Sequence, residues 1–226
     1  MSMSTSLTFD RVRKSFRRDA ALKGVSFQLE PGTVIGLIGP NGSGKSTTLK
    51  LLAGAILPDE GVIRIPDALS RMGLQTETFT VPIRISGEGW LRFQRRMEHS
   101  MCSDFEMRMI QRLGMTEHLK KSAKAYSKGM LKKLGILSAF LGMPPVVLLD
   151  EPFEGLDPVD RHEVMLMVRE VAAMGHLVVI SSHILYELDD ACDRILILKR
   201  GELIRDLGRD RESLQSTYID LFREAL

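Results

Sequence analysis

Nine consecutive residues early in the chain have the types and spacing that bind a polyphosphate. They are Gly39, Pro40, Asn41, Gly42, Ser43, Gly44, Lys45, Ser46 and Thr47. The glycines allow a tight turn whose successive N–H groups point inward and form an anion-binding nest. Lys45 would reach the β- and γ-phosphates of a nucleotide, and Ser46 would ligate Mg²⁺. The pattern G-x-x-x-x-G-K-[ST] therefore predicts a phosphate-binding loop with a magnesium ligand.

Two adjacent acidic residues, Asp150 and Glu151, follow the apolar run of residues 146–149. Such a run predicts a strand buried in a parallel sheet, and ligands bind at the carboxyl ends of such strands. We expect Asp150 to hold Mg²⁺ through water, and Glu151 to orient and polarise the attacking water. The alternative is a strand that merely ends in charge, which the upstream phosphate-binding loop disfavours.

Two further polar residues end predicted strands at the same sheet edge. His183 follows the apolar residues 177–180, and this position predicts a contact with the γ-phosphate. Gln75 ends a short strand over residues 71–75. Its amide oxygen would contact Mg²⁺ or the attacking water, although a glutamine considered alone is more often a surface residue.

Ser127 and Phe16 have less specific surroundings in the sequence. Ser127 is a plausible N-cap for a helix that runs through Leu141, and the positive end of that helix would suit a second phosphate, as any capped helix would. For Phe16, at the end of the first strand, two interpretations stay open. It either stacks on an adenine face or is an ordinary half-buried strand residue.

The phosphate-binding loop counts only if a strand enters it and a helix leaves it. Residues 33–38 are apolar and β-branched as a buried strand requires, and residues 47–53 continue as a helix that Gly54 closes. Other strands are expected over residues 7–16, 25–29, 61–65, 194–198 and 203–204, the first two in an antiparallel sheet. Other helices are expected over residues 159–174, 185–192 and the end of the chain.

Residues 85–125 have a different composition, with few β-branched residues and many Met and Arg. We expect a small helical insertion there. Its methionines either form an adaptable docking surface or fill the core of the insertion; they are Met97, Met101, Met107, Met109 and Met115. The chain is thus expected to be one domain, with a core over residues 1–84 and 146–226 and a helical subdomain over residues 85–145.

Length and composition describe a globular protein with one substantial core. The 226 residues carry 31 Lys and Arg against 29 Asp and Glu, so the charge gives no reason to expect a nucleic-acid partner. Cys102 and Cys192 are far apart, which argues against a disulfide framework or a zinc site and fits a reducing cytosol. No apolar run reaches the about 20 residues that a membrane-spanning helix needs.

In their order, these motifs resemble those of the ATP-binding subunits of ATP-binding cassette (ABC) transporters over nearly the whole chain. The resemblance implies an α/β fold with a P-loop NTPase core, whose mostly parallel sheet is flanked by helices, together with an N-terminal antiparallel β subdomain and a helical subdomain insertion. The resemblance also implies a role for each motif residue. Phe16 would stack on adenine, residues 39–47 would be Walker A, Gln75 would be in the Q-loop and Asp150 would be the Walker B acid. Glu151 would be the catalytic base, Asp157 would be in the D-loop and His183 would be the switch histidine.

The resemblance places a signature motif at residues 126–130, where this chain departs from the family's Leu-Ser-Gly-Gly-Gln. Tyr126, Lys128 and Met130 replace Leu, Gly and Gln, whereas Ser127 and Gly129, which the family uses to contact phosphate, are kept. This variant is similar to those of bacterial export-type cassettes. The resemblance therefore implies an ATPase that is part of an exporter.

The resemblance also implies partners, cofactors and a location. Two ATPase subunits, in a homodimer or pseudo-dimer, would enclose two ATP with Mg²⁺ and drive separate transmembrane permease subunits from the cytoplasmic face of the membrane, as a peripheral protein. The alternative is a soluble ABC-type mechanical ATPase acting in cluster assembly or DNA repair, which the absence of heptads and of a basic stripe disfavours. A GTPase is disfavoured because no Asn-Lys-x-Asp motif is present.

Overall fold

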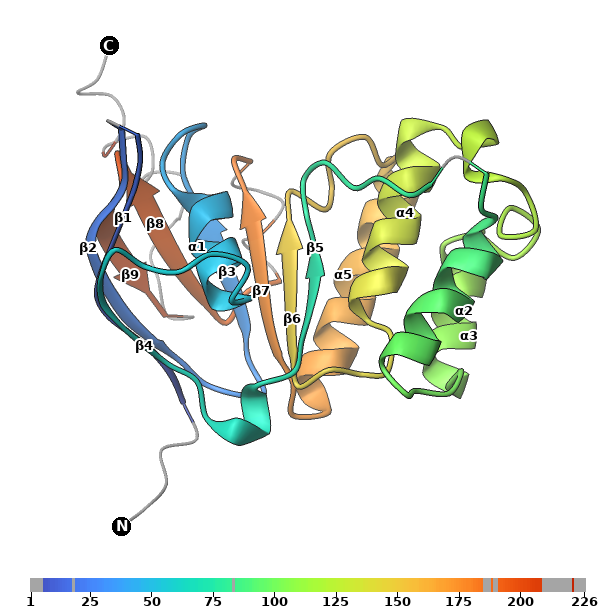
Figure 1. The fold of residues 1–226 in the computed structure, drawn as a ribbon, viewed down its shortest axis with the longest axis horizontal. Helices are drawn as coiled ribbons and strands as arrows, with labels where there is room; N and C mark the ends of the chain where they lie inside the picture. The colour runs from blue at the N-terminus through green and yellow to red at the C-terminus, as the bar shows by residue number, and fades with distance from the viewer. Residues whose placement is uncertain are drawn as a thin grey trace.

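The computed structural model describes residues 6–17, 19–82, 84–184, 188, 191–208 and 221. Their helices and strands form successive layers, with two sheets toward one end of the molecule and a group of helices at the other (Figure 1). The helices expected over residues 185–192 and at the end of the chain lie mostly outside the described residues.

A six-stranded sheet carries Gln75, Asp150, Glu151 and His183 at or just beyond its carboxyl edge. Its strands, in spatial order, are β5 (Met72–Gln75), β6 (Val146–Asp150), β7 (Leu177–Ser182), β3 (Val34–Ile38), β8 (Arg194–Lys199) and β9 (Glu202–Leu207). Neighbouring strands are parallel except for β9, which is antiparallel to β8. Strands β3, β6 and β7 are buried along their whole length, as expected of apolar strands covered on both faces.

A three-stranded antiparallel sheet packs over one side of this core. Its spatial order is β2 (Asp19–Leu29), β1 (Leu7–Phe16) and β4 (Glu60–Arg64). The sequence predicted β2 only from residue 25, because the preceding residues lack an apolar alternation. Those residues are mainly exposed or half-buried, and they are drawn into the sheet by pairing with β1, where Phe16 lies opposite Asp19.

Helix α1 (Lys45–Leu52) leaves the phosphate-binding loop and lies between the two sheets (Figure 1). Its Leu49, Leu51 and Leu52 share a buried cluster with Phe9 of β1 and Leu148 of β6. This apolar contact on both sides of α1 fixes the direction in which the amino end of the helix points. The positive end of the helix dipole is therefore held at the sheet edge where the site residues lie.

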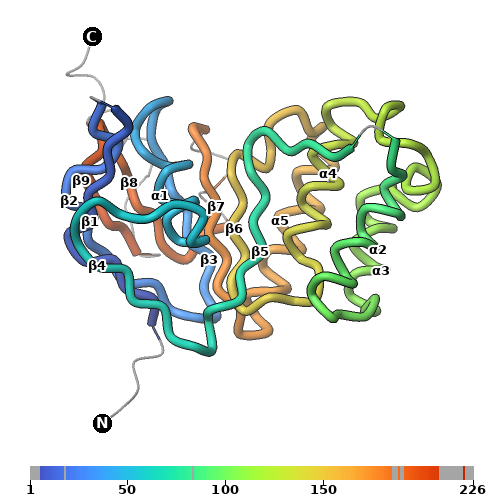
Figure 2. The backbone as a smooth tube through the Cα atoms, viewed as in Figure 1, coloured from blue at the N-terminus to red at the C-terminus, as the bar shows by residue number. Residues whose placement is uncertain are grey.

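Helices α5 (Pro158–Ala173) and α4 (Lys128–Ala139) cover the other face of the sheet. Helices α2 (Gly87–Met97) and α3 (Asp104–Arg112) lie at the end of the molecule farthest from the antiparallel sheet (Figure 2). Short 3₁₀ turns occur at η1 (Asp67–Leu69) and η2 (Ala123–Ala125). Helices α2, α3 and α4 all fall within residues 85–145, but the division of the chain at those limits stays a prediction.

The methionines of the insertion divide between the two interpretations. Met109 and Met115 are buried in the core cluster of the helices, whereas Met97, Met101 and Met107 are exposed. Core filling therefore describes the first two residues. A docking role for the other three stays a prediction.

We expect Gly73→Ala to destabilise the fold, because β5 passes very close to the end of α4. A Cβ atom at Gly73 would lie 1.7 Å from the carbonyl oxygen of Ala139. Overpacking of this kind destabilises a folded core by about 1–3 kcal/mol, and urea denaturation would measure the change. Gly208→Ala is the control, because among the described residues, its chain neighbours aside, no atom lies within 4 Å of its added Cβ. Equal unfolding free energies for the two variants would contradict the close approach.

Candidate active site

The phosphate-binding loop follows β3 and lines a cleft of about 500 Å³, a size typical of small-ligand sites. A Cβ at Gly44 would lie 2.7 Å from the carbonyl oxygen of Ala21, and one at Gly39 would lie 2.2 Å from that of Leu198. Glycine is therefore required at both positions by close packing. The cleft is lined by Ala21, residues 41–47, Glu77, Glu151, Glu154 and His183.

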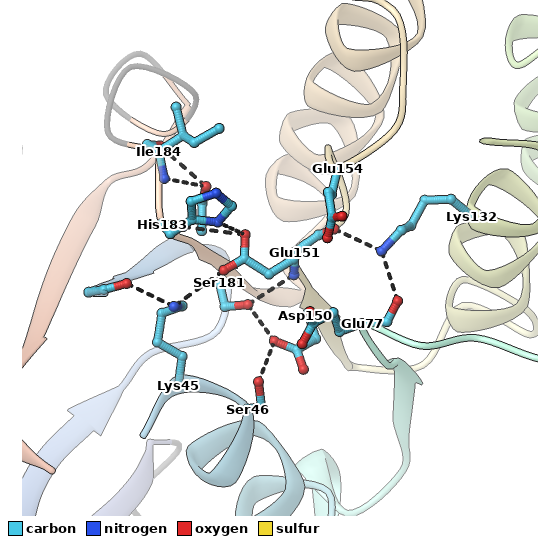
Figure 3. A network of polar contacts seen from close by, with 12 residues as sticks. Lys45, Ser46, Glu77, Lys132, Asp150, Glu151, Glu154, Ser181, His183 and Ile184 are labelled. Carbon is cyan, nitrogen blue, oxygen red and sulfur yellow. Dashed lines mark hydrogen bonds and ion pairs between the residues drawn. The ribbon is translucent and has the colours of Figure 1, made fainter. Parts of the chain in front are cut away.

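The cleft brings Lys45, Glu151 and His183 together from three separate elements (Figure 3). The Lys45 Nζ lies 3.3 Å from Glu151 Oε1 and donates a hydrogen bond of 2.8 Å to the carbonyl oxygen of Gly39. The other Glu151 oxygen, Oε2, lies 2.8 Å from His183 Nδ1. Lys45 and Glu151 are both buried. An incoming phosphate would therefore compete with the Glu151 carboxylate for the Lys45 ammonium.

The backbone of Glu151 is in the left-handed region, with φ of 47°. For a residue with a side chain this conformation is unfavourable by roughly 1–2 kcal/mol, so surrounding contacts must hold it. The Glu151 N–H donates to Ser181 Oγ at 3.0 Å, and the Glu151 carbonyl oxygen accepts from Lys132 Nζ at 2.9 Å. Side chains from β7 and α4 thus fix the turn that aims the carboxylate into the cleft.

Oxygen ligands for a magnesium ion gather beside Lys45. Ser46 Oγ lies 3.1 Å from Asp150 Oδ1, and both groups are oxygen ligands that Mg²⁺ prefers. Gln75 is fully buried at the end of β5, where its Nε2 donates to the carbonyl oxygen of Asp150 at 3.2 Å. Its Oε1 is buried and has no hydrogen-bond partner among the described residues. A buried acceptor of this kind calls for a partner, so these residues fit the expected Mg²⁺.

Besides Ala21 in the cleft lining, sequence reasoning missed four polar residues of this site. Glu77 and Glu154 line the cleft, Ser181 Oγ donates to Asp150 Oδ1 at 2.6 Å, and Lys132 is buried behind Glu151. The position of Ser181 at the end of the strand that leads to His183 was a usable signal. The other three gave none, because their places depend on how α4 packs against the loops that follow β5 and β6.

Two lysines of α4 lie close to the acidic residues of the site. Lys128 Nζ lies 2.6 Å from Glu154 Oε1, and this hydrogen bond holds the pKa of the Glu154 carboxyl below its usual range. Burial lowers the pKa of the Lys132 ammonium, while the charges of Glu154 and Asp150 act in the opposite direction. The start of α4 is therefore electrostatically coupled to the acidic residues at and beyond the carboxyl end of β6.

The remaining predicted site residues do not line this cleft. Phe16 is 47% exposed, with Lys14 Nζ 5.7 Å from its ring centroid. Ser127 caps α4 by accepting from the Met130 N–H, which confirms the expected N-cap. Gly129 lies in the first turn of the same helix.

Asp157, a predicted contact of the nucleotide, also lies outside the lining of the cleft. It caps α5, because its Oδ1 accepts a 2.9 Å hydrogen bond from the Asp160 N–H, which lowers the pKa of Asp157. Pro40 and Gly39 belong to the loop but do not line the cleft either. The roles predicted for Phe16, Ser127, Gly129 and Asp157 at a nucleotide therefore stay predictions.

Comparisons with known proteins show the family of the chain. The family model described as ABC transporter matches residues 22–154, and a second model, described as an AAA domain, matches residues 120–189. The chain is 34% identical to the uncharacterised ABC transporter ATP-binding protein YxlF of Bacillus subtilis, over 87% of this chain and 69% of that protein. It is 31% identical to the Nod factor export ATP-binding protein I of Paraburkholderia xenovorans, over 88% of this chain and 70% of that protein.

A solved structure described as an ATP-binding subunit of an ABC transporter has the same fold. It superposes with a TM-score of 0.85 at 28% identity, covering 96% of this chain and 99% of that one. The expected fold class is thereby confirmed. Of the helices in the described residues, none has both the length and the apolar character that a membrane span requires.

We expect Ser181→Ala to destabilise the chain, because one hydroxyl group serves two buried partners. Its removal leaves the Glu151 N–H without its acceptor and takes the nearer of two hydroxyl donors from Asp150 Oδ1, which keeps Ser46 Oγ at 3.1 Å. A buried polar group left unpaired in this way destabilises a fold by about 1–3 kcal/mol. Urea denaturation would measure the loss against Ser70→Ala, which removes an exposed hydroxyl that donates to the Asp67 carbonyl oxygen. A loss no larger than that of the control would contradict this arrangement.

Proposed function

The chain belongs to the ABC transporter family, and we propose that it is the ATP-hydrolysing subunit that drives transport through separate transmembrane subunits. The observation that carries this proposal is the contact of Glu151 with both Lys45 and His183 at the mouth of the phosphate-binding loop. These groups are suited to cleaving the bond between the β- and γ-phosphates. The proposal thus rests on the arrangement of Lys45, Glu151 and His183 as well as on membership of the family.

Residues in and beside the cleft have distinct tasks in this reaction. The loop N–H groups and Lys45 bind the β- and γ-phosphates. Glu151 accepts a hydrogen bond from water and takes up its proton as the water oxygen attacks the γ-phosphorus, and His183 contacts the γ-phosphate. The bond from phosphorus to the β–γ bridging oxygen then breaks, and ADP and phosphate are released. When bound by Ser46, Asp150 and Gln75, Mg²⁺ neutralises charge on the phosphates.

A single chain does not complete this site. Ser127 and Gly129 do not line the cleft of their own chain, although both lie at the amino end of a helix suited to phosphate. We propose a two-fold, head-to-tail dimer, formed by identical or related subunits, in which these residues and Asp157 approach the ATP held by the partner subunit. Phe16 would contact the adenine ring at the open side of each cleft.

Hydrolysis would be coupled to transport through the helical subdomain. New charge repulsion after phosphate-bond cleavage opens the dimer, and α2 and α3 transmit this motion to the membrane subunits. The exposed methionines Met97 and Met101 lie on this part of the chain and suit an adaptable contact surface. The protein would act as a peripheral protein at the cytoplasmic face of the membrane.

Export is the proposed direction of transport. The name of the relative from Paraburkholderia xenovorans specifies export of Nod factor by that protein, and the Tyr-Ser-Lys-Gly-Met signature supports the same direction. The alternative of a soluble mechanical ATPase is disfavoured, because the relatives described above are named as components of transporters or export systems.

Glu151→Gln is expected to convert the chain from a hydrolysing enzyme into a stable ATP-bound dimer. The amide keeps the shape of the side chain but cannot accept the proton of water, so ATP persists between the subunits. Size-exclusion chromatography with light scattering would show the dimer with ATP and Mg²⁺, and a phosphate-release assay would show the lost hydrolysis. Lys45→Ala, which removes the phosphate-binding ammonium, should show neither dimer nor hydrolysis. Full ATPase activity in Glu151→Gln would refute the assignment of the base.

A membrane partner is expected to co-purify with the Glu151→Gln protein. Detergent-solubilised membranes of the source organism would be incubated with the tagged protein, ATP and Mg²⁺, and the captured proteins identified by mass spectrometry. The expected result is a multi-spanning membrane protein that is absent when Lys45→Ala is the bait. Capture of soluble partners alone, with efficient membrane extraction demonstrated, would favour the soluble mechanical ATPase instead.

A further inference from the structure

Lys132 is a buried cation to which the proposed mechanism gives no task. It is 3% exposed, and its ammonium donates to two backbone oxygens, that of Glu151 at 2.9 Å and that of Glu77 at 3.1 Å. A lysine is rarely buried to this degree unless its charge is compensated. Its contacts therefore point to a task at the catalytic edge.

We propose that Lys132 is a positioning residue for Glu151, and that it makes the placement of the catalytic carboxylate depend on the position of α4. The proposal rests on the proposed function, in which Glu151 polarises the attacking water. Lys132 itself does not line the cleft. Its effect on catalysis would pass through the backbone of Glu151.

The conformation of Glu151 explains why such a contact is needed. Its φ of 47° is unfavourable for a residue with a side chain, and a conformation of this kind persists only where the surroundings hold it. A second hydrogen bond to the Glu151 carbonyl oxygen, from the Glu154 N–H, is longer at 3.4 Å. The charged donor of Lys132 is both nearer and stronger. Without it, the turn would relax and the carboxylate would move relative to Lys45.

The Lys132 ammonium joins three segments at one atom (Figure 3). It extends from α4, whose amino end Ser127 caps. It holds Glu77, two residues beyond Gln75 at the end of β5, and it holds Glu151, directly after β6. A displacement of α4 against a partner subunit would therefore be transmitted to the catalytic carboxylate and to the segment after Gln75 together.

Carboxylates around Lys132 balance its charge. Glu154, Asp150 and Glu77 each favour the charged ammonium, while burial disfavours it and lowers the pKa of Lys132 overall. A charged donor suits this position better than a neutral amide. The two carbonyl oxygens carry partial negative charges, and the three nearby carboxylates carry full negative charges.

The next residue of α4 provides a matched control. Lys133 Nζ lies 2.5 Å from Asp160 Oδ2 and donates to the carbonyl oxygen of Leu113 at 3.0 Å. It is thus a partly buried lysine on the same helix with a carboxylate partner, but it has no contact with Glu151. Replacing it should disturb the packing of α4 and leave the catalytic backbone in place.

Steady-state hydrolysis of MgATP by the full chain would test the proposal with Lys132→Met, Lys132→Arg and Lys133→Met. We expect Lys132→Met to lower kcat about 10- to 100-fold, the effect of a small misplacement of a catalytic group, while KM stays within about threefold. Lys132→Arg restores N–H donors and should recover most of kcat. Lys133→Met should keep kcat within about twofold of the wild type, even where its melting temperature falls as far as that of Lys132→Met.

A double-mutant cycle with Glu151→Gln separates positioning from general loss of structure. If Lys132 acts through Glu151, adding Lys132→Met to Glu151→Gln should cause no further fall in residual hydrolysis. Should Lys132→Met fail to fold, Lys132→Gln takes its place, since its shorter amide keeps a polar group but does not reach both carbonyl oxygens.

Two results would overturn the proposal alone. The first is a kcat of Lys132→Met within about twofold of an active wild type. The second is a fall in residual hydrolysis on adding Lys132→Met to Glu151→Gln that is as large as the fall Lys132→Met causes in the wild type. If the wild-type chain does not hydrolyse ATP, or if its hydrolysis does not depend on Glu151, the proposed function is overturned and this inference with it. The two failures are therefore distinguishable.

Discussion

The buried contact between the Lys45 ammonium and the Glu151 carboxylate is the interaction on which the site depends. Both charges are withdrawn from water, and either one alone would be strongly unfavourable in that place. Their pairing holds the loop after β3 and the turn after β6 against each other. Lys45, which would bind phosphate, and Glu151, which would polarise water, are therefore held close together. The Glu151 carboxylate contacts the same ammonium group that phosphate oxygens would contact.

Much of this arrangement was predictable from the sequence because it depends on local patterns. The apolar runs before Lys45, Asp150 and His183 specify parallel strands, and parallel strands present their carboxyl ends at one edge. The glycines of the loop specify its turn. Ser127 was identifiable as a cap from its place before a helix. These features need only neighbouring residues to be recognised.

Other features could not be predicted, because they depend on contacts between distant segments. Residues 19–24 become part of β2 through pairing with β1 and not through their own alternation. Lys132 gave no signal in the sequence, since it looks like a surface lysine until α4 packs against the turn after β6 and the segment after β5. The division of the methionines between core and surface likewise follows from how α2 and α3 pack, which composition alone does not specify.

The length of β5 has a consequence for how the protein behaves in a crowded solution. β5 is a four-residue edge strand of the six-stranded sheet, and a short edge offers few unpaired N–H and C=O groups to a strand of another molecule. Uncontrolled pairing along such an edge leads to aggregation. The proposed subunit would join and leave its partner in every catalytic cycle. A short edge strand disfavours strand pairing between molecules, so that the subunits associate through surfaces that can separate again.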